Sequence, residues 1–291
     1  MIVQICKAKL ATGEVFVGVL QGDSVLRLDA ENPLGIRTLS DLLHAPDFNR
    51  LAHDVMRYCQ RKVELKDATL LAPLDHQEVW AAGVTYQRSQ EARERESADA
   101  ARFYDLVYTA SRPELFFKAT ANRVVGPGDA VVIRRDSRWS VPEPELALVL
   151  SPSMQLVGYT IGNDMSARDI EGENPLYLPQ AKVYHGCCAL GPCVTLAAAL
   201  PPLDQVIIRL TIERGAKPIF DGATHLSAMA RSFGDLISWL GRENRFPQGV
   251  ILLTGTGIVP PDEFTLADGD LVSIDITGIG RLSNPVQRGV D

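Results

Sequence analysis

The stretch Val141-Pro142-Glu143-Pro144-Glu145-Leu146-Ala147-Leu148-Val149-Leu150 places two acidic residues at the start of an apolar run. The prolines favour an entry turn, and the apolar run is typical of a buried strand. In an extended chain Glu143 and Glu145 project from the same face, because side chains alternate with a period of two. Their carboxylates repel each other in a buried strand unless a cation lies between them. The stretch therefore predicts a cation site, with a solvated strand edge as the alternative.

A second apolar run, Leu156–Gly162, ends in Asn163 and Asp164. The polar link between the two runs, Ser151–Gln155, is short enough for a hairpin. Such a hairpin brings Asp164 beside the two glutamates, and three hard oxygen donors suit Mg²⁺, Mn²⁺ or Ca²⁺. Strict alternation puts Asn163 opposite Glu143, so we expect a bulge or the end of pairing to turn Asp164 inward.

The composition excludes several classes of protein. A formal net charge of −7 over 291 residues argues against a general binder of nucleic acid or of an anionic membrane surface. The sequence shows no secretion signal, and no apolar run approaches the ~20 residues of a membrane span. Five cysteines are an odd number without a small disulfide scaffold around them. We therefore expect a cytoplasmic protein.

The order of the predicted elements favours two units. Residues 1–72 contain short strands with glycine-bearing turns, then two predicted helices at Thr38–Ala45 and Asn49–Arg61, so we expect a small N-terminal α/β unit. Residues 73–291 carry the acidic stretch and most of the remaining strands. The expected fold class is α+β and rich in strands.

Two further helices are predicted in the larger unit. The first half of Arg88–Ala110 has almost no apolar face, which fits a solvated helix and a mobile lid over a polar site equally well. Ser227–Asn244 has an apolar stripe at helical spacing, which favours core packing. Between them, Glu171–Gln180 is rich in proline and is predicted to be a loop.

Three basic residues, Lys118, Arg168 and Lys182, stand in apolar or Gly/Pro-rich surroundings. In an acidic protein, cations near a metal suggest an anionic ligand such as a carboxylate. We favour a structural ion pair with Asp169 or Glu171 for Arg168, and a functional role for Lys182. Cys187 and its cysteine neighbours lack the spacing of a zinc site, so buried free thiols are the better interpretation.

Together these motifs resemble the fumarylacetoacetate hydrolase family over about Trp80 to Val286. The residues that carry the resemblance are Glu143-Pro144-Glu145-Leu146-Ala147, Gly158-Tyr159-Thr160, Asn163-Asp164-Met165-Ser166-Ala167-Arg168-Asp169, Lys182 and Thr254-Gly255-Thr256. Within the family, Arg112–Thr120 and Glu173–Gln180 are similar to members that dehydrate 2-keto-3-deoxy sugar acids. The resemblance implies a mixed β-roll with flanking helices, assembled as a homodimer or homotetramer.

The resemblance also implies a site and a reaction. Glu143, Glu145 and Asp164 would bind Mg²⁺, and the substrate would be a small anionic 2-keto acid of the 2-keto-3-deoxy-D-arabinonate type. Elimination of water through a metal-stabilised enolate would give 2,5-dioxopentanoate. We expect Lys182 to transfer the proton, with Glu114 as the second candidate. The residues expected to bind the substrate are Thr85, Tyr86, Ser89, Lys118, Lys182 and Thr256.

One departure from the family pattern favours elimination over hydrolysis. Hydrolytic relatives carry a His, with a Glu three residues later, after the segment that corresponds to Gly83-Val84-Thr85-Tyr86. Ser89 and Ala92 stand at those positions, and neither activates water as a His–Glu pair does. The alternatives are hydrolysis of an acylpyruvate or diketo sugar acid, with water activated by Glu91 or Glu94, and a sugar-acid sensor without catalysis.

Overall fold

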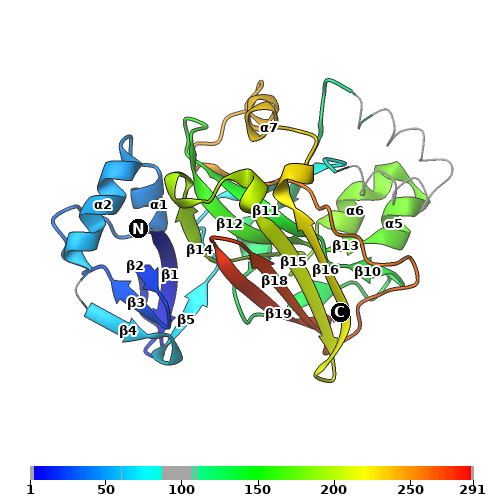
Figure 1. The fold of residues 1–291 in the computed structure, drawn as a ribbon, viewed down its shortest axis with the longest axis horizontal. Coiled ribbons are helices and arrows are strands. Elements are labelled where there is room, and N and C mark those ends of the chain that lie inside the picture. Colours follow the sequence, from blue (N-terminus) through cyan, green and yellow to red (C-terminus); the bar gives the residue numbers. More distant parts are fainter. Residues whose placement is uncertain (1–2, 60, 87–106, 108–109, 290–291) are drawn as a thin grey trace.

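The computed structural model describes residues 3–59, 61–86, 107 and 110–289 (Figure 1). Its strands are β1 (Gln4–Leu10), β2 (Val15–Gln21), β3 (Ser24–Arg27), β4 (Arg61–Glu64), β5 (Ala68–Leu71), β6 (Glu78–Gly83), β7 (Glu114–Ala119), β8 (Val124–Val125), β9 (Val131–Ile133), β10 (Ser140–Val141), β11 (Pro144–Leu150), β12 (Leu156–Asp164), β13 (Ser166–Ala167), β14 (Cys188–Leu196), β15 (Ile207–Arg214), β16 (Lys217–His225), β17 (Val250–Leu253), β18 (Leu271–Ile276) and β19 (Gly280–Arg288). The helices are α1 (Leu39–Leu43), α2 (Phe48–Tyr58), α5 (Arg168–Glu173), α6 (Leu178–Lys182) and α7 (Phe233–Leu240).

Two sheets and the apolar layer between them form the body of the molecule. The large sheet has the order β4-β3-β2-β1-β14-β12-β11-β17-β6-β7, and the second has the order β16-β15-β18-β19-β9. Most pairs are antiparallel, but β17 with β6 and β19 with β9 are parallel. Leucines of β11 such as Leu146 and Leu148 share one buried cluster with Leu210 of β15 and Ile274 of β18. This mixed, strand-rich architecture confirms the expected fold class.

Four of the five described helices lie toward the two ends of the large sheet. Helices α1 and α2 cover the N-terminal strands at one end, and α5 and α6 lie at the other end, beside the short strands β10 and β13 (Figure 1). Thr38 caps α1 through a capping box with Asp41. Two predictions were wrong. The predicted loop Glu171–Gln180 is largely helical, and the helix predicted at Ser227–Asn244 covers only Phe233–Leu240, with Ser232 as its N-cap. The helix predicted at Arg88–Ala110 lies almost entirely outside the described residues.

The β11–β12 hairpin fixes the geometry of the acidic residues. The structure pairs Pro144 with Asn163, and the Asp164 N–H donates to the Glu143 carbonyl at 2.9 Å. Asp164 therefore lies opposite Glu143, and its side chain points to the same face. The expected bulge is present: the register shifts by one residue between Val149 and Leu150, at the turn end of the hairpin, and this shift brings Asp164 rather than Asn163 opposite Glu143. A local change near the turn shifts the facing of every residue beyond it.

Strand β14 joins the two predicted units into one sheet. It pairs with β12 on one side and with β1 on the other, where Ile5 faces Val194. Its residues are all buried, so it shows no alternation of polar and apolar side chains, and the sequence analysis did not identify it. The boundary predicted at residue 72 stays a prediction, since the sheet runs across it.

A buried network around Asp75 attaches helix α1 to the first strand. Its carboxylate accepts from Lys7 at 2.7 Å and from both the N–H and the hydroxyl of Ser40 at 2.8 Å. Burial alone would raise the pKa of Asp75, but the hydrogen bonds from Lys7 and Ser40 outweigh it and hold the pKa below its usual value. The network therefore stabilises the fold only while Asp75 is ionised.

We expect Asp75→Asn to lower the free energy of unfolding by about 1–3 kcal/mol at pH 7. A carboxyl whose pKa is depressed by folding contributes stability above its unfolded pKa of about 3.9, and this contribution is lost as the pH falls through the folded value. Urea unfolding should therefore show a difference between wild type and variant that narrows below about pH 4. The exposed Asp67 provides the control, and Asp67→Asn should change little. A difference that is constant with pH would contradict the ionic role.

Candidate active site

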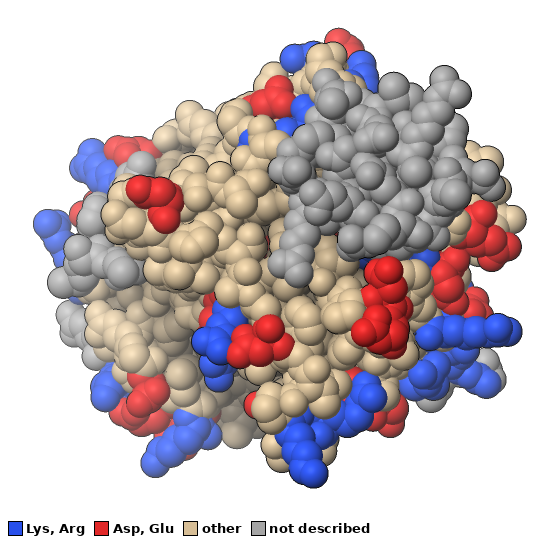
Figure 2. Space-filling view, turned by 45° about the vertical axis from the view of Figure 1, so that its right-hand side comes forward, with Lys and Arg blue, Asp and Glu red and all other residues tan. Residues whose placement is uncertain are grey.

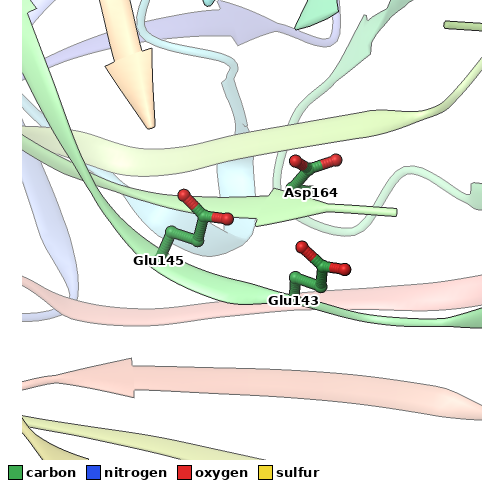
Figure 3. Close-up of side chains that lie close together, drawn as sticks. All are labelled: Glu143, Glu145 and Asp164. Atoms are coloured by element: carbon green, nitrogen blue, oxygen red, sulfur yellow. The ribbon is translucent and has the colours of Figure 1, made fainter. Parts of the chain in front are cut away.

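Three buried carboxylates meet at the mouth of the β11–β12 hairpin. Each of Glu143, Glu145 and Asp164 offers an oxygen, and these oxygens lie within 4.8 Å of one another. Figure 3 shows the two glutamates on one strand and the aspartate on its neighbour, all turned toward a common space. Their exposed fractions are 5%, 1% and 1%, so water screens their mutual repulsion poorly. Among the described residues this is the group that could hold a metal ion.

The corner after β17 supports Glu145. Strand β17 pairs with β11, and the chain then turns so that the Gly255 N–H donates to Oε2 of Glu145 at 2.5 Å. Gly255 has a φ of +90°, and a Cβ there would lie 2.0 Å from the Thr85 hydroxyl oxygen. Glycine is therefore required for this close approach. Thr85 in turn donates to the Thr254 carbonyl at 2.7 Å.

Two basic side chains contact the other two carboxylates. The Lys182 ammonium at the end of α6 lies 2.9 Å from Oε2 of Glu143 and 3.3 Å from Oδ2 of Asp164. The Arg168 guanidinium lies 3.0 Å from Oε1 of Glu143. Both side chains are buried, so each ion pair forms at low local dielectric.

Glu145 has the most perturbed carboxyl of the three. Burial raises its pKa well above the ordinary value, and the neighbouring charges of Asp164 and Glu143 raise it further. The Gly255 N–H and the charge of Lys182 act in the opposite direction. A hard divalent cation would relieve the repulsion that raises this pKa, and carboxylate oxygens are the donors that Mg²⁺ prefers. The residues present therefore fit such an ion.

The residues predicted to transfer protons or to bind substrate lie in different places. Glu114, Thr256 and Lys182 line one inner cavity together with Glu143 and Asp164. Thr85 and Tyr86 are buried beside it, and burial together with the charge of Glu145 raises the pKa of Tyr86. Ser89 lies outside the described residues, as do Glu91, Ala92 and Glu94.

Lys118 takes a different position. Its ammonium lies 2.5 Å from Oδ1 of Asp164, and its side chain has no exposed surface. It contacts the aspartate without lining the inner cavity. Its role as a substrate ligand stays a prediction.

The sequence analysis missed three features of the site. Arg168 contacts Glu143, whereas Asp169 accepts hydrogen bonds from Ser137 and from the Arg138 N–H. Glu171 is buried, accepts from the Ser166 hydroxyl at 2.9 Å and lines the inner cavity. The third feature is the hydrogen bond from the Gly255 N–H to Glu145. The sequence signal for Arg168 was its position. It is a charged residue in the run Met165–Asp169, which follows the predicted metal ligand Asp164.

An outer cavity of about 380 Å³ adjoins the inner one. Glu114 and Glu171 line both cavities, while Arg112, Leu115 and Leu178 line only the outer one. The outer cavity therefore combines charged and apolar walls at the approach to the carboxylates. This combination suits a small polar ligand with a carbon backbone.

The remaining chemistry-bearing residues are accounted for differently. The five cysteines are free and buried, which confirms the interpretation made from the sequence.

Positive and negative side chains are interspersed over the face in Figure 2. In the described part of the chain, no helix is both long and apolar enough to cross a bilayer.

Comparison with known proteins identifies the family. The profile of the fumarylacetoacetate (FAA) hydrolase C-terminal domain matches residues 78–287. A probable 2-keto-3-deoxyxylonate dehydratase of Haloferax volcanii is 52% identical over 220 residues, which make up 76% of this chain and 75% of the relative. A 2-dehydro-3-deoxy-D-arabinonate dehydratase of Saccharolobus solfataricus is 39% identical over 281 residues, or 93% of this chain and 91% of the relative.

A solved structure shares the whole fold. It is 2-keto-3-deoxy-D-arabinonate dehydratase complexed with magnesium and 2,5-dioxopentanoate, with a TM-score of 0.84, 35% identity and coverage of 99% of this chain and 100% of that chain. The chain therefore belongs to the fumarylacetoacetate hydrolase family, which confirms the resemblance found in the sequence.

Proposed function

We propose that the protein is a Mg²⁺-dependent dehydratase that converts a 2-keto-3-deoxypentonate, of the arabinonate or xylonate type, to 2,5-dioxopentanoate. The observation that carries this proposal is the buried carboxylate triad with the Lys182 ammonium 2.9 Å from one member and 3.3 Å from another. Two relatives named as dehydratases of these sugar acids support the choice of substrate.

The chain supplies the ligands and the groups that move protons. Glu143, Glu145 and Asp164 would hold the ion. Bound there, Mg²⁺ would withdraw electron density from the chelated keto group and so acidify the neighbouring C3–H. Lys182, as the neutral amine, would take the C3 proton, and Glu114, in its protonated form, would assist loss of the C4 hydroxyl as water. Thr256, which lines the same cavity, would hydrogen-bond the substrate.

The atoms balance over the whole reaction. Loss of the C3 proton and the C4 hydroxyl leaves a double bond between C3 and C4. Transfer of a proton from C5 to C3 moves the double bond to C4 and C5, where it forms an enol with the C5 hydroxyl. Tautomerisation of this enol gives the aldehyde at C5, and one water is released.

An assay with purified protein and Mg²⁺ separates the three candidate functions. We expect 2-keto-3-deoxy-D-arabinonate to yield an aldehyde without chain cleavage. Pyruvate release from an acylpyruvate would instead support hydrolysis, and binding without turnover would support a sensor. Chelation of the metal should stop turnover, and added Mg²⁺ should restore it. Turnover that persists in chelator would contradict the metal-dependent proposal.

The position of Glu114 in this scheme can be tested through its neighbour Gly83. The two residues face each other across β6 and β7, and a Cβ at Gly83 would lie 2.0 Å from Oε2 of Glu114. Gly83→Ala should therefore displace this carboxylate and lower kcat by roughly 10- to 100-fold, since small misplacements have effects of this size. Mg²⁺ affinity, measured by calorimetry, should stay near that of the wild type.

Gly234→Ala is the matched control for that substitution. Gly234 lies on α7, and the nearest atom to its added Cβ is 4.0 Å away. This variant should keep full activity. Wild-type turnover by Gly83→Ala would argue against a catalytic role for Glu114.

Assembly and location extend the proposal. We propose a homodimer or homotetramer in the cytoplasm, and the free state of the five buried cysteines supports a reducing compartment. Light scattering of the purified protein distinguishes a monomer from these assemblies.

A further inference from the structure

We propose that Lys118 is a positioning residue. It orients Asp164 and the backbone of Lys182, and it does not contact the substrate. This inference rests on the proposed function, but the experiment that tests it measures Mg²⁺ binding and does not depend on dehydration of a substrate. It replaces the expectation from the sequence that Lys118 is a substrate ligand.

The ammonium of Lys118 has three N–H groups and three acceptors. It lies 2.5 Å from Oδ1 of Asp164, 2.8 Å from the Met165 carbonyl and 2.6 Å from the Lys182 carbonyl. An ammonium donates three hydrogen bonds and accepts none. No donor of Lys118 is therefore left for a substrate, and its side chain has no exposed surface through which a substrate could reach it.

These three contacts join separate parts of the active site. Lys118 itself belongs to β7, whose first residue is Glu114. Asp164 ends β12 and Met165 follows it directly, and Lys182 ends α6. One buried side chain thus connects the strand of one proposed proton-transfer residue, the helix of the other, and a metal ligand.

The contact with Asp164 determines which oxygen can serve the metal. Lys118 occupies Oδ1, while Oδ2 faces the site, where Lys182 lies 3.3 Å away. The arrangement favours binding of the ion through one oxygen. The ring of Tyr184 lies 5.9 Å from the Lys118 ammonium and restricts its movement on another side.

The electrostatics are consistent with a permanent ion pair. Burial opposes the charged form of Lys118, but the charge of Asp164 outweighs this effect and holds the pKa of Lys118 above its ordinary value. Residues that orient metal ligands in this way affect metal affinity or activity by about 10- to 100-fold when they are replaced.

Two opposite effects on metal affinity make the proposal testable. If Lys118 acted only through its charge, its removal would strengthen Mg²⁺ binding, because a cation near the ion would be lost. If Lys118 positions Asp164, its removal weakens binding, because the carboxylate is free to turn away.

Calorimetric titration with Mg²⁺ of full-length Lys118→Met is the primary experiment. We expect the dissociation constant to rise about 10- to 100-fold, with kcat lowered as well. Affinity that is unchanged or tighter would overturn the proposal. Lys118→Arg is the second variant: it keeps the charge but cannot place three N–H groups on the same three acceptors, so we expect weaker binding here too. Wild-type affinity of Lys118→Arg would show that charge alone suffices and would equally overturn the proposal.

A control separates positioning from general loss of stability. Arg214 is paired with the fully buried Asp270 at 2.7 Å, outside the carboxylate site. Arg214→Met also removes the cation from a buried acid, so it should lower Tm without changing Mg²⁺ affinity. If the wild type binds Mg²⁺ but does not dehydrate its substrate, the proposed function fails while the positioning inference is still tested by the titrations.

Discussion

Asp164→Asn protein should bind Mg²⁺ more than about 100-fold more weakly than the wild type and should show no measurable dehydration, since the loss of a ligand exceeds the effect of losing its supporting residues. The amide keeps the shape of the side chain but carries no charge. It also leaves the buried Lys118 ammonium without its carboxylate partner, which destabilises the fold. Calorimetry with Mg²⁺, together with thermal unfolding, measures both effects.

A nearby aspartate provides the control for that experiment. Asp169 lies five residues along the chain and accepts hydrogen bonds from Ser137 and Arg138, outside the triad. Asp169→Asn should retain Mg²⁺ affinity and activity even if it costs some stability. Full activity in Asp164→Asn would remove the basis of the proposed function.

Lys182→Met should lower kcat by about 10²- to 10⁴-fold, the usual contribution of a positioned acid or base. Mg²⁺ affinity should be retained, because the substitution removes a positive charge from beside two metal ligands. The combination of retained metal and lost turnover is the expected signature of a proton-transfer residue. Isothermal titration and a dehydration assay on the same preparation measure both quantities.

The exposed Lys62 controls for the general effect of losing a lysine. Its side chain is 60% exposed and contacts only the exposed Glu64 among the described ion pairs. Lys62→Met should behave as the wild type. If Lys182→Met keeps full activity, the proton must move through another group, and Glu114→Gln becomes the decisive variant.

The identity of the metal ligands could be predicted from the sequence because the evidence for them is local. Glu145 lies on β11 and Glu143 directly precedes it, and a short polar link places Asp164 on the next strand. The need for a bulge followed from the spacing, but its position could not be predicted, because the irregularity between Val149 and Leu150 leaves no distinctive mark in an apolar run.

Residues brought from distant segments were harder to predict. The hydrogen bond from Gly255 to Glu145 joins residues 110 positions apart. The strand Cys188–Leu196 is buried on both faces and contains a Gly-Pro pair, so neither alternation nor composition identifies it. The segment after Arg168 forms short helices although it contains proline, because Pro175 and Pro179 both stand at the first positions of helical turns, where proline is tolerated.

The hairpin tolerates changes of length unevenly along its course. A residue added within the link Ser151–Gln155 lengthens the turn and leaves the strand pairing beyond the existing irregularity unchanged. The same change between Glu143 and Leu146 would rotate a carboxylate to the opposite face of the sheet and replace it with an apolar side chain. A change of length is therefore compatible with catalysis when it falls in the turn, and incompatible with catalysis when it falls between Glu143 and Leu146.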